Sequence, residues 1–144
     1  MHVTVTNAQR ALPINTAEVK RLARRAIRTL RIRTPGTLAI TFISDRRIRT
    51  LNNRFLRHDR TTDVLCFRYD PQMGNGNHAI VGEILIAPGQ ARAYAKRHGL
   101  SYTEELSRYV VHGLLHWRGY ADRTKTQQRQ MRAQEDRLLA RCRR

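Results

Sequence analysis

The chain has 144 residues, of which 40% are hydrophobic, so it is long enough to bury a core without disulfides, and we expect one domain spanning residues 1–144. It lacks the roughly 18 consecutive apolar residues of a membrane span, and residues 1–10 lack the pattern of a signal peptide, so we expect a cytoplasmic protein. Its net charge of +17, with 28 basic residues against 11 acidic ones, favours nucleic acid over a membrane or an acidic protein as partner.

The first part of the chain predicts two strands and two helices. A strand over Val3–Thr6 is followed by a helix that we expect Thr16 to cap, with apolar residues at helical spacing from Val19 to Leu30. The other face of this helix is basic, which is typical of a solvated surface and is a secondary candidate for RNA contact. A strand over Leu38–Ile43 follows, and then a short helix capped by Ser44 or Asp45 with Ile48, Leu51 and Phe55 inward.

The second part predicts a hairpin and three more helices. Strands over Val64–Phe67 and Ile80–Ala87 flank a segment rich in turn-forming residues. The first helix begins at Pro88, the second follows a capping box at Ser101–Glu104, and the last begins near Thr126. Together these elements predict an α+β fold, with a single layer of about four mixed strands packed against helices.

Two histidines on the second of these helices suggest a metal site. His112 and His116 are four residues apart, which places their Cβ atoms roughly 6 Å apart on one helix face. If the helix continued, Asp122 would lie about 240° around the axis from His116 and point away. Gly119 allows the helix to stop, so that Asp122 can return as a third ligand. We therefore expect a mononuclear site with open coordination positions at the C-terminal end of a central helix.

The neighbouring residues argue against two familiar uses of such a site. Gly113 stands where a HExxH peptidase carries its general-base glutamate, so a thermolysin-like mechanism is disfavoured. Two histidines and one carboxylate also match the ligands of non-haem iron oxygenases, but the run of strands typical of their barrel is missing.

Three segments of the chain carry recognisable motifs: VHGLLHWRGY (111–120), LNNRFLRHDRTTDVLCF (51–67) and GEILI (82–86). They resemble, in turn, the signature HGxLHxxGYDH, the segment ending in TDVLSF and the GDIxI strand of the YbeY family of metal-dependent endoribonucleases. The three segments follow the family's order. The resemblance implies cleavage of single-stranded RNA in the maturation of the small-subunit rRNA 3′ end and in ribosome quality control, with the small ribosomal subunit as partner. It also implies one divalent metal, for which we expect zinc, held by His112, His116 and Asp122.

The sequence departs from the family pattern in two places. The family's third ligand is a histidine, whereas Asp122 stands there in this chain, and RT (123–124) and MRAQED (131–136) resemble a branch of the family that carries this aspartate. A carboxylate makes the site harder and more receptive to manganese or iron. The family's catalytic arginine corresponds to Leu56, so we expect Arg57 or Arg60 to take over its role in catalysis and RNA binding.

Some roles stay open on the sequence alone. Asp63 and Glu83 are candidates for the general base, although both are also explained as structural residues. Two other functions compete with an endoribonuclease in which His112 is a catalytic ligand. One is a non-catalytic, basic ribosome-assembly factor with a structural metal, and the other is a metal-dependent hydrolase of another substrate such as a peptide. Cys66 and Cys142 do not suggest a disulfide, since Cys66 reads as a small buried hydrophobe and Cys142 belongs to the basic tail.

Overall fold

A mixed β-sheet forms the base of the molecule. The computed structural model describes residues 1–56, 64–69 and 79–142. Within them, the sheet has the strand order β1-β2-β4-β3, made of β1 (His2–Asn7), β2 (Thr37–Phe42), β3 (Val64–Arg68) and β4 (Ile80–Ile86). β2 runs parallel to both β1 and β4, whereas β3 pairs with β4 in antiparallel fashion. The predicted α+β fold and the predicted hairpin are therefore confirmed.

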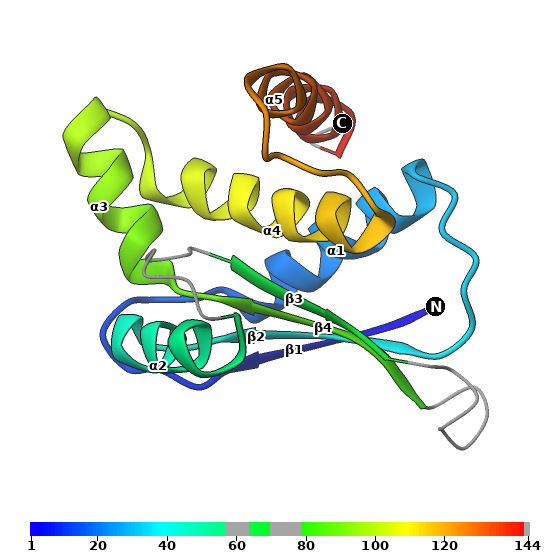
Figure 1. Ribbon diagram of the computed structural model, residues 1–144, viewed down its shortest axis with the longest axis horizontal. Coiled ribbons are helices and arrows are strands. Elements are labelled where there is room, and N and C mark those ends of the chain that lie inside the picture. The colour runs from blue at the N-terminus through cyan, green and yellow to red at the C-terminus, as the bar shows by residue number, and fades with distance from the viewer. Residues whose placement is uncertain (57–63, 70–78, 143–144) are drawn as a thin grey trace.

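Helices pack on both faces of this sheet. They are α1 (Thr16–Thr29), α2 (Asp45–Leu51), α3 (Pro88–His98), α4 (Tyr102–Arg118) and α5 (Lys125–Cys142), with a π-helical turn, η1 (Asn52–Leu56), after α2. Figure 1 shows α4 lying across the sheet, with α5 on the side of α4 away from the strands. Ile84 and Ile86 join the main core with α4, whereas Leu85 belongs to a second cluster with Ile48 of α2. Successive side chains of a strand point to opposite faces of the sheet, so neighbouring residues of β4 belong to different clusters.

The helix starts follow side-chain capping. Ser101 Oγ accepts a hydrogen bond from the Glu104 amide at 3.3 Å, as the capping box predicts. Ser44, and not Asp45, caps α2. The prediction that Thr16 caps the first helix is wrong by one residue. Asn15 holds the extended cap conformation and its Oδ1 accepts from the Glu18 amide at 3.2 Å, while Thr16 is already helical.

One face of α4 is buried against the sheet and carries Leu106, Tyr109, Val110, Gly113, Leu114 and Trp117, which form an apolar stripe. Gly113 lets α4 lie close to β4, since a Cβ at this position would come within 2.6 Å of Ile84 Cγ2. A glutamate therefore has no room at position 113, which gives a structural reason for the missing peptidase motif. Because this stripe faces the strands, His112 and His116 lie on the flank of α4.

The two cysteines are both free, as expected. Cys66 is only partly buried, whereas Cys142, within the basic tail, is only 6% exposed. It joins the main core because α5 continues as far as this residue. Among the described residues, none of the helices combines the length and apolarity needed to cross a bilayer.

Candidate metal centre

His112 and His116 lie side by side on the last turns of α4. Their ring centroids are 4.5 Å apart and the rings are nearly perpendicular, at 80°. Each side chain keeps 26% of its surface exposed. The pair is therefore fixed by the helix and still open to solvent, as a site for an external substrate requires.

Gly119 ends α4 and turns the chain back towards the histidines. Its φ of 118° lies in a region that L-residues rarely adopt. The amide of Gly119 bonds to the His116 carbonyl at 3.0 Å, and the amide of Tyr120 bonds to the Leu115 carbonyl, also at 3.0 Å. These bonds form the Schellman motif, a common helix ending.

The start of α5 then fixes Asp122. Gln128 Nε2 donates to the Asp122 carbonyl at 3.2 Å. Thr124 Oγ1 accepts from the Gln127 amide at 3.0 Å, while Gln127 Oε1 accepts from the Thr124 amide at 3.2 Å. The Schellman motif fixes one end of the connection between α4 and α5, and this reciprocal cap fixes the other. The backbone therefore determines where Asp122 lies.

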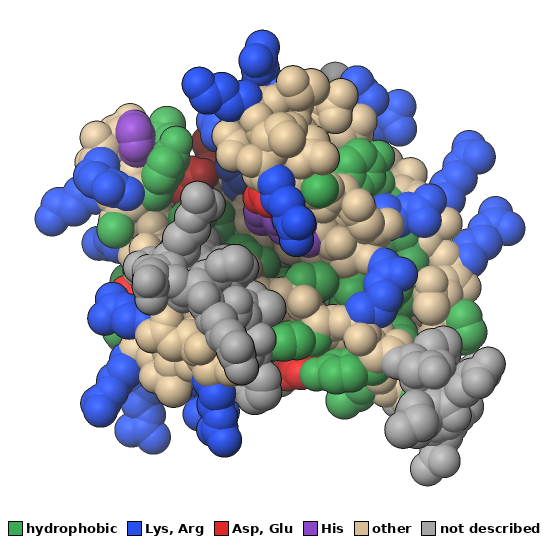
Figure 2. Space-filling view, viewed as in Figure 1, with side chains coloured by type: hydrophobic (Ala, Val, Ile, Leu, Met, Phe, Trp, Pro, Cys, Tyr) green, Lys and Arg blue, Asp and Glu red, His purple; other side chains and the backbone are tan. Residues whose placement is uncertain are grey.

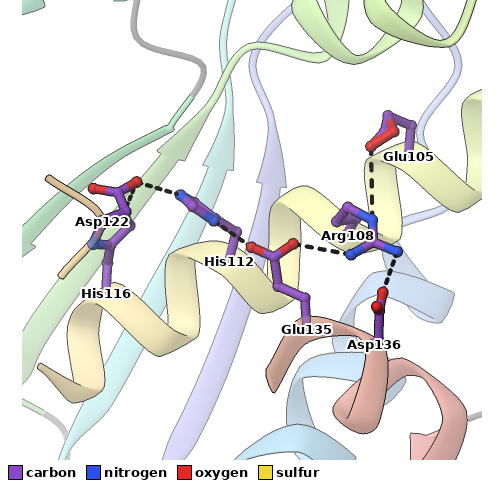
Figure 3. Close-up of polar contacts among 7 residues, drawn as sticks. All are labelled: Glu105, Arg108, His112, His116, Asp122, Glu135 and Asp136. Carbon is purple, nitrogen blue, oxygen red and sulfur yellow. Dashed lines mark hydrogen bonds and ion pairs between the residues drawn. The ribbon is translucent and has the colours of Figure 1, made fainter. Parts of the chain in front are cut away.

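The three side chains bring one donor atom each to a common point. Asp122 Oδ2 lies 3.1 Å from His116 Nε2 and 3.5 Å from His112 Nε2. One atom from each residue lies within 4.8 Å of the other two. Bonds of about 2.0–2.1 Å around tetrahedral zinc separate ligand atoms by about 3.3 Å, so the observed spacing fits such an ion. Figure 3 shows both imidazoles directed at the Asp122 carboxylate.

The same contacts perturb the protonation of the cluster. Burial opposes a charge on His112, but hydrogen bonds to Asp122 and Glu135 outweigh it and raise the pKa of the imidazole from 6.5 to about 9. The hydrogen bond from His112 lowers the pKa of the Asp122 carboxyl to about 2, although burial acts in the opposite direction. The surroundings thus favour positive charge between the carboxylates, whether it is carried by protons or by a cation.

A partly buried ion-pair network lies next to His112 on the side away from Asp122, and the sequence assigned no role to it. Glu135 Oε2 lies 2.6 Å from His112 Nδ1, and Glu135 Oε1 lies 3.0 Å from Arg108 Nη1. Arg108 Nη2 in turn donates to Asp136 Oδ1 at 2.7 Å. The only signal for these acids was the MRAQED segment (131–136), read above as a mark of a family branch.

Arg68 lies near the site, whereas Glu83 lies on the opposite face of the sheet. Arg68 is exposed on β3, and its guanidinium carbon lies 4.7 Å from the ring centroid of Trp117, the residue after His116. Glu83 cannot serve as a base at this centre, because Gly82 and Ile84 face α4 and strand alternation turns Glu83 to the opposite side of the sheet. There it accepts a hydrogen bond from the Tyr69 hydroxyl at 2.8 Å.

The remaining candidates from the sequence lie outside the described residues. They are the two arginines Arg57 and Arg60 and the possible base Asp63. Figure 2 shows histidine and acidic side chains near the centre of the displayed face, with Lys and Arg side chains beside them and around the rim.

Comparison with known proteins gives a consistent result. The family model described as "Endoribonuclease YbeY" matches residues 4–143. A protein named Endoribonuclease YbeY from Geobacter metallireducens is 30% identical over 143 residues, covering 97% of this chain and 95% of its own. A protein of the same name from Geobacillus kaustophilus is 32% identical, with coverages of 94% and 90%. The solution structure of TM1509 from Thermotoga maritima has the same fold, with a TM-score of 0.62 at 20% identity, covering 97% of this chain and 88% of that one.

Proposed function

Because this chain belongs to the YbeY family of endoribonucleases, we propose that it cleaves single-stranded RNA at a divalent cation held by His112, His116 and Asp122. The observation that carries the proposal is the convergence of two imidazole nitrogens and one carboxylate oxygen within 4.8 Å. The substrate that we propose is the precursor of the small-subunit rRNA, cleaved near its 3′ end. The small ribosomal subunit is then the partner, and quality control of ribosomes is a second use of the same activity.

The three side chains of the site would hold the cation, and the cation would supply the chemistry of cleavage. A bound divalent cation, for which zinc fits the donor set, would supply Lewis acidity at a phosphate oxygen and would lower the pKa of a water molecule bound to it. His112 and His116 would hold it through their Nε2 atoms, and Asp122 would do so through Oδ2. The partial exposure of all three side chains leaves the solvent side free for the RNA phosphate.

Arginines are the natural ligands for the rest of the RNA backbone, since a guanidinium binds phosphate in bidentate fashion. We keep Arg57 and Arg60 as candidates that neutralise charge at the cleaved phosphate. Arg68 is a further candidate, because it is exposed on the edge strand and stacks on Trp117 next to His116. Replacement of Arg68 by Gln is expected to raise KM more than it lowers kcat.

Metal-dependent cleavage is tested with purified protein and a labelled single-stranded RNA. The unaltered chain should cut the RNA, a chelator should stop the reaction, and added zinc should restore it. His116→Ala should be inactive, whereas His98→Ala should keep full activity, because His98 lies at the end of α3 and contacts Tyr94. Equal cleavage by the unaltered chain and His116→Ala in chelator would reduce the chain to an RNA binder.

The rRNA substrate is tested in cells that lack the chain. We expect small-subunit rRNA with an extended 3′ end to accumulate, and the unaltered gene and His98→Ala to remove the extension. His116→Ala should leave it in place. Full rescue by His116→Ala would instead support a non-catalytic assembly factor, in which the cation only fixes the end of α4.

A further inference from the structure

The ring of His112 is held on its far side by a carboxylate from another helix. Glu135 lies on α5, 23 residues further along the chain, and its side chain is only 6% exposed. Its Oε2 lies 2.6 Å from His112 Nδ1 (Figure 3). An ionised carboxylate only accepts hydrogen bonds, so Nδ1 carries the hydrogen and Nε2 is the nitrogen available towards Asp122.

Arg108 prevents the Glu135 carboxylate from turning. It lies one helical turn before His112 and donates to Glu135 Oε1 at 3.0 Å, so both carboxylate oxygens are engaged. The guanidinium is itself fixed by Asp136 at 2.7 Å and approaches Glu105 at 3.8 Å. Glu135 is therefore a buried acid whose charge is balanced and whose orientation is fixed by α4.

We propose that Glu135, oriented by Arg108, is a positioning residue that sets the tautomer and the ring direction of His112 so that Nε2 faces the cation. The inference deepens the proposed function and rests on the metal site defined above. A carboxylate behind a ligating imidazole makes the nitrogen more basic and spares the cost of ordering the ring when the metal binds. Losing such a partner typically weakens metal binding roughly 10- to 100-fold.

The same contact links metal binding to the packing of α5. Glu135 and Asp122 reach His112 from opposite sides, one from the middle of α5 and one from the segment that leads into it. A cation that fixes His112 and Asp122 therefore also favours the docked position of α5. Zinc should accordingly slow amide hydrogen exchange in α5, in addition to the end of α4.

The experiment measures zinc affinity by competition with a chromogenic chelator, with the RNA left out. Glu135→Gln keeps an oxygen acceptor but loses the charge, and we expect its Kd for zinc to rise about tenfold. Glu135→Ala loses the acceptor as well, and its Kd should rise about 100-fold. Glu18→Gln is the matched control, because it makes the same exchange at an exposed carboxylate in the first turn of α1, outside this network, and its Kd should not change.

Ring nitrogen chemical shifts of the zinc-loaded protein provide a second readout, which a purely structural role of Glu135 would leave unchanged. In the unaltered chain and in Glu135→Gln, His112 should carry its hydrogen on Nδ1. In Glu135→Ala, the spectra should show a mixture of His112 tautomers or of ligating nitrogens. An unchanged Kd for Glu135→Gln would overturn the inference and leave the proposed function intact, even if Glu135→Ala fails to fold. Failure of the unaltered chain to bind zinc would overturn both.

Discussion

Replacement of Gly119 by Ala tests whether the end of α4 places the third ligand. Gly119 has φ 118° and ψ 3°, and a Cβ added there would meet no atom within 4 Å. The substitution therefore introduces backbone strain without a steric clash. A non-glycine residue held in such a conformation costs roughly 1–3 kcal/mol.

The strain has a consequence for metal binding as well as for stability. Without metal, the segment after Arg118 can rotate to relieve the strain and carry Asp122 away from the histidines. The cation must then restore the strained conformation, so the loss of binding energy is at most equal to the strain. One to two kcal/mol corresponds to roughly a 5- to 30-fold rise in the Kd for zinc.

Gly99 provides a matched control for this experiment. It ends α3 with φ 64° and ψ 33°, and a Cβ there would also meet no atom within 4 Å. Gly99→Ala should lower the free energy of unfolding in urea by about 1 kcal/mol while leaving the Kd for zinc unchanged. The reasoning is refuted if Gly119→Ala binds zinc as tightly as the unaltered chain, or if Gly99→Ala weakens binding equally.

Three further outcomes follow from the site and the core. Asp122→His raises the charge of the donor set by one and strengthens the Lewis acid, so the pH–rate profile of RNA cleavage should move to lower pH, and an unshifted profile contradicts this. In Gly82→Ala the new Cβ would clash with Trp117 Nε1, so the free energy of unfolding in urea should fall by about 1–3 kcal/mol, and an unchanged value would refute the close packing. Burial raises the pKa of the Cys66 thiol from 9.0 to about 11, although Arg68 lowers it, so the reactive thiolate is scarce at neutral pH. Mass spectrometry should therefore show that alkylation of Cys66 is slow at neutral pH and accelerates as the pH approaches 11. Rapid alkylation at neutral pH would contradict the raised pKa.

Local spacing was sufficient to predict that these three side chains come together. His112 and His116 share a helix face at any position in a fold, and Gly119 with Asp122 follows within six residues. The structure brings the three together, and the family resemblance is confirmed by the comparisons. The α+β class and the extents of most elements were also predictable, because hydrophobic periodicity reflects burial directly.

Features that depend on packing between distant segments were not predictable in this way. Glu135 reaches His112 only because α5 folds back over α4, and no spacing rule relates residues 23 positions apart on different helices. The sequence could not show which face of the sheet Glu83 occupies, so it remained a candidate for the base. In the structure, the register of β4 places Glu83 on the face away from α4. The place of β4 between β2 and β3 likewise depends on tertiary packing and not on the order of the strands in the chain.

Every role proposed for the site requires a cation bound between His112, His116 and Asp122. The most direct measurement is an anomalous difference map, recorded at the zinc absorption edge from crystals grown with zinc. We predict one strong peak about 2.0–2.1 Å from the two Nε2 atoms and from Asp122 Oδ2. A map without density between these three atoms, from crystals in which zinc is bound elsewhere or not at all, would contradict the account.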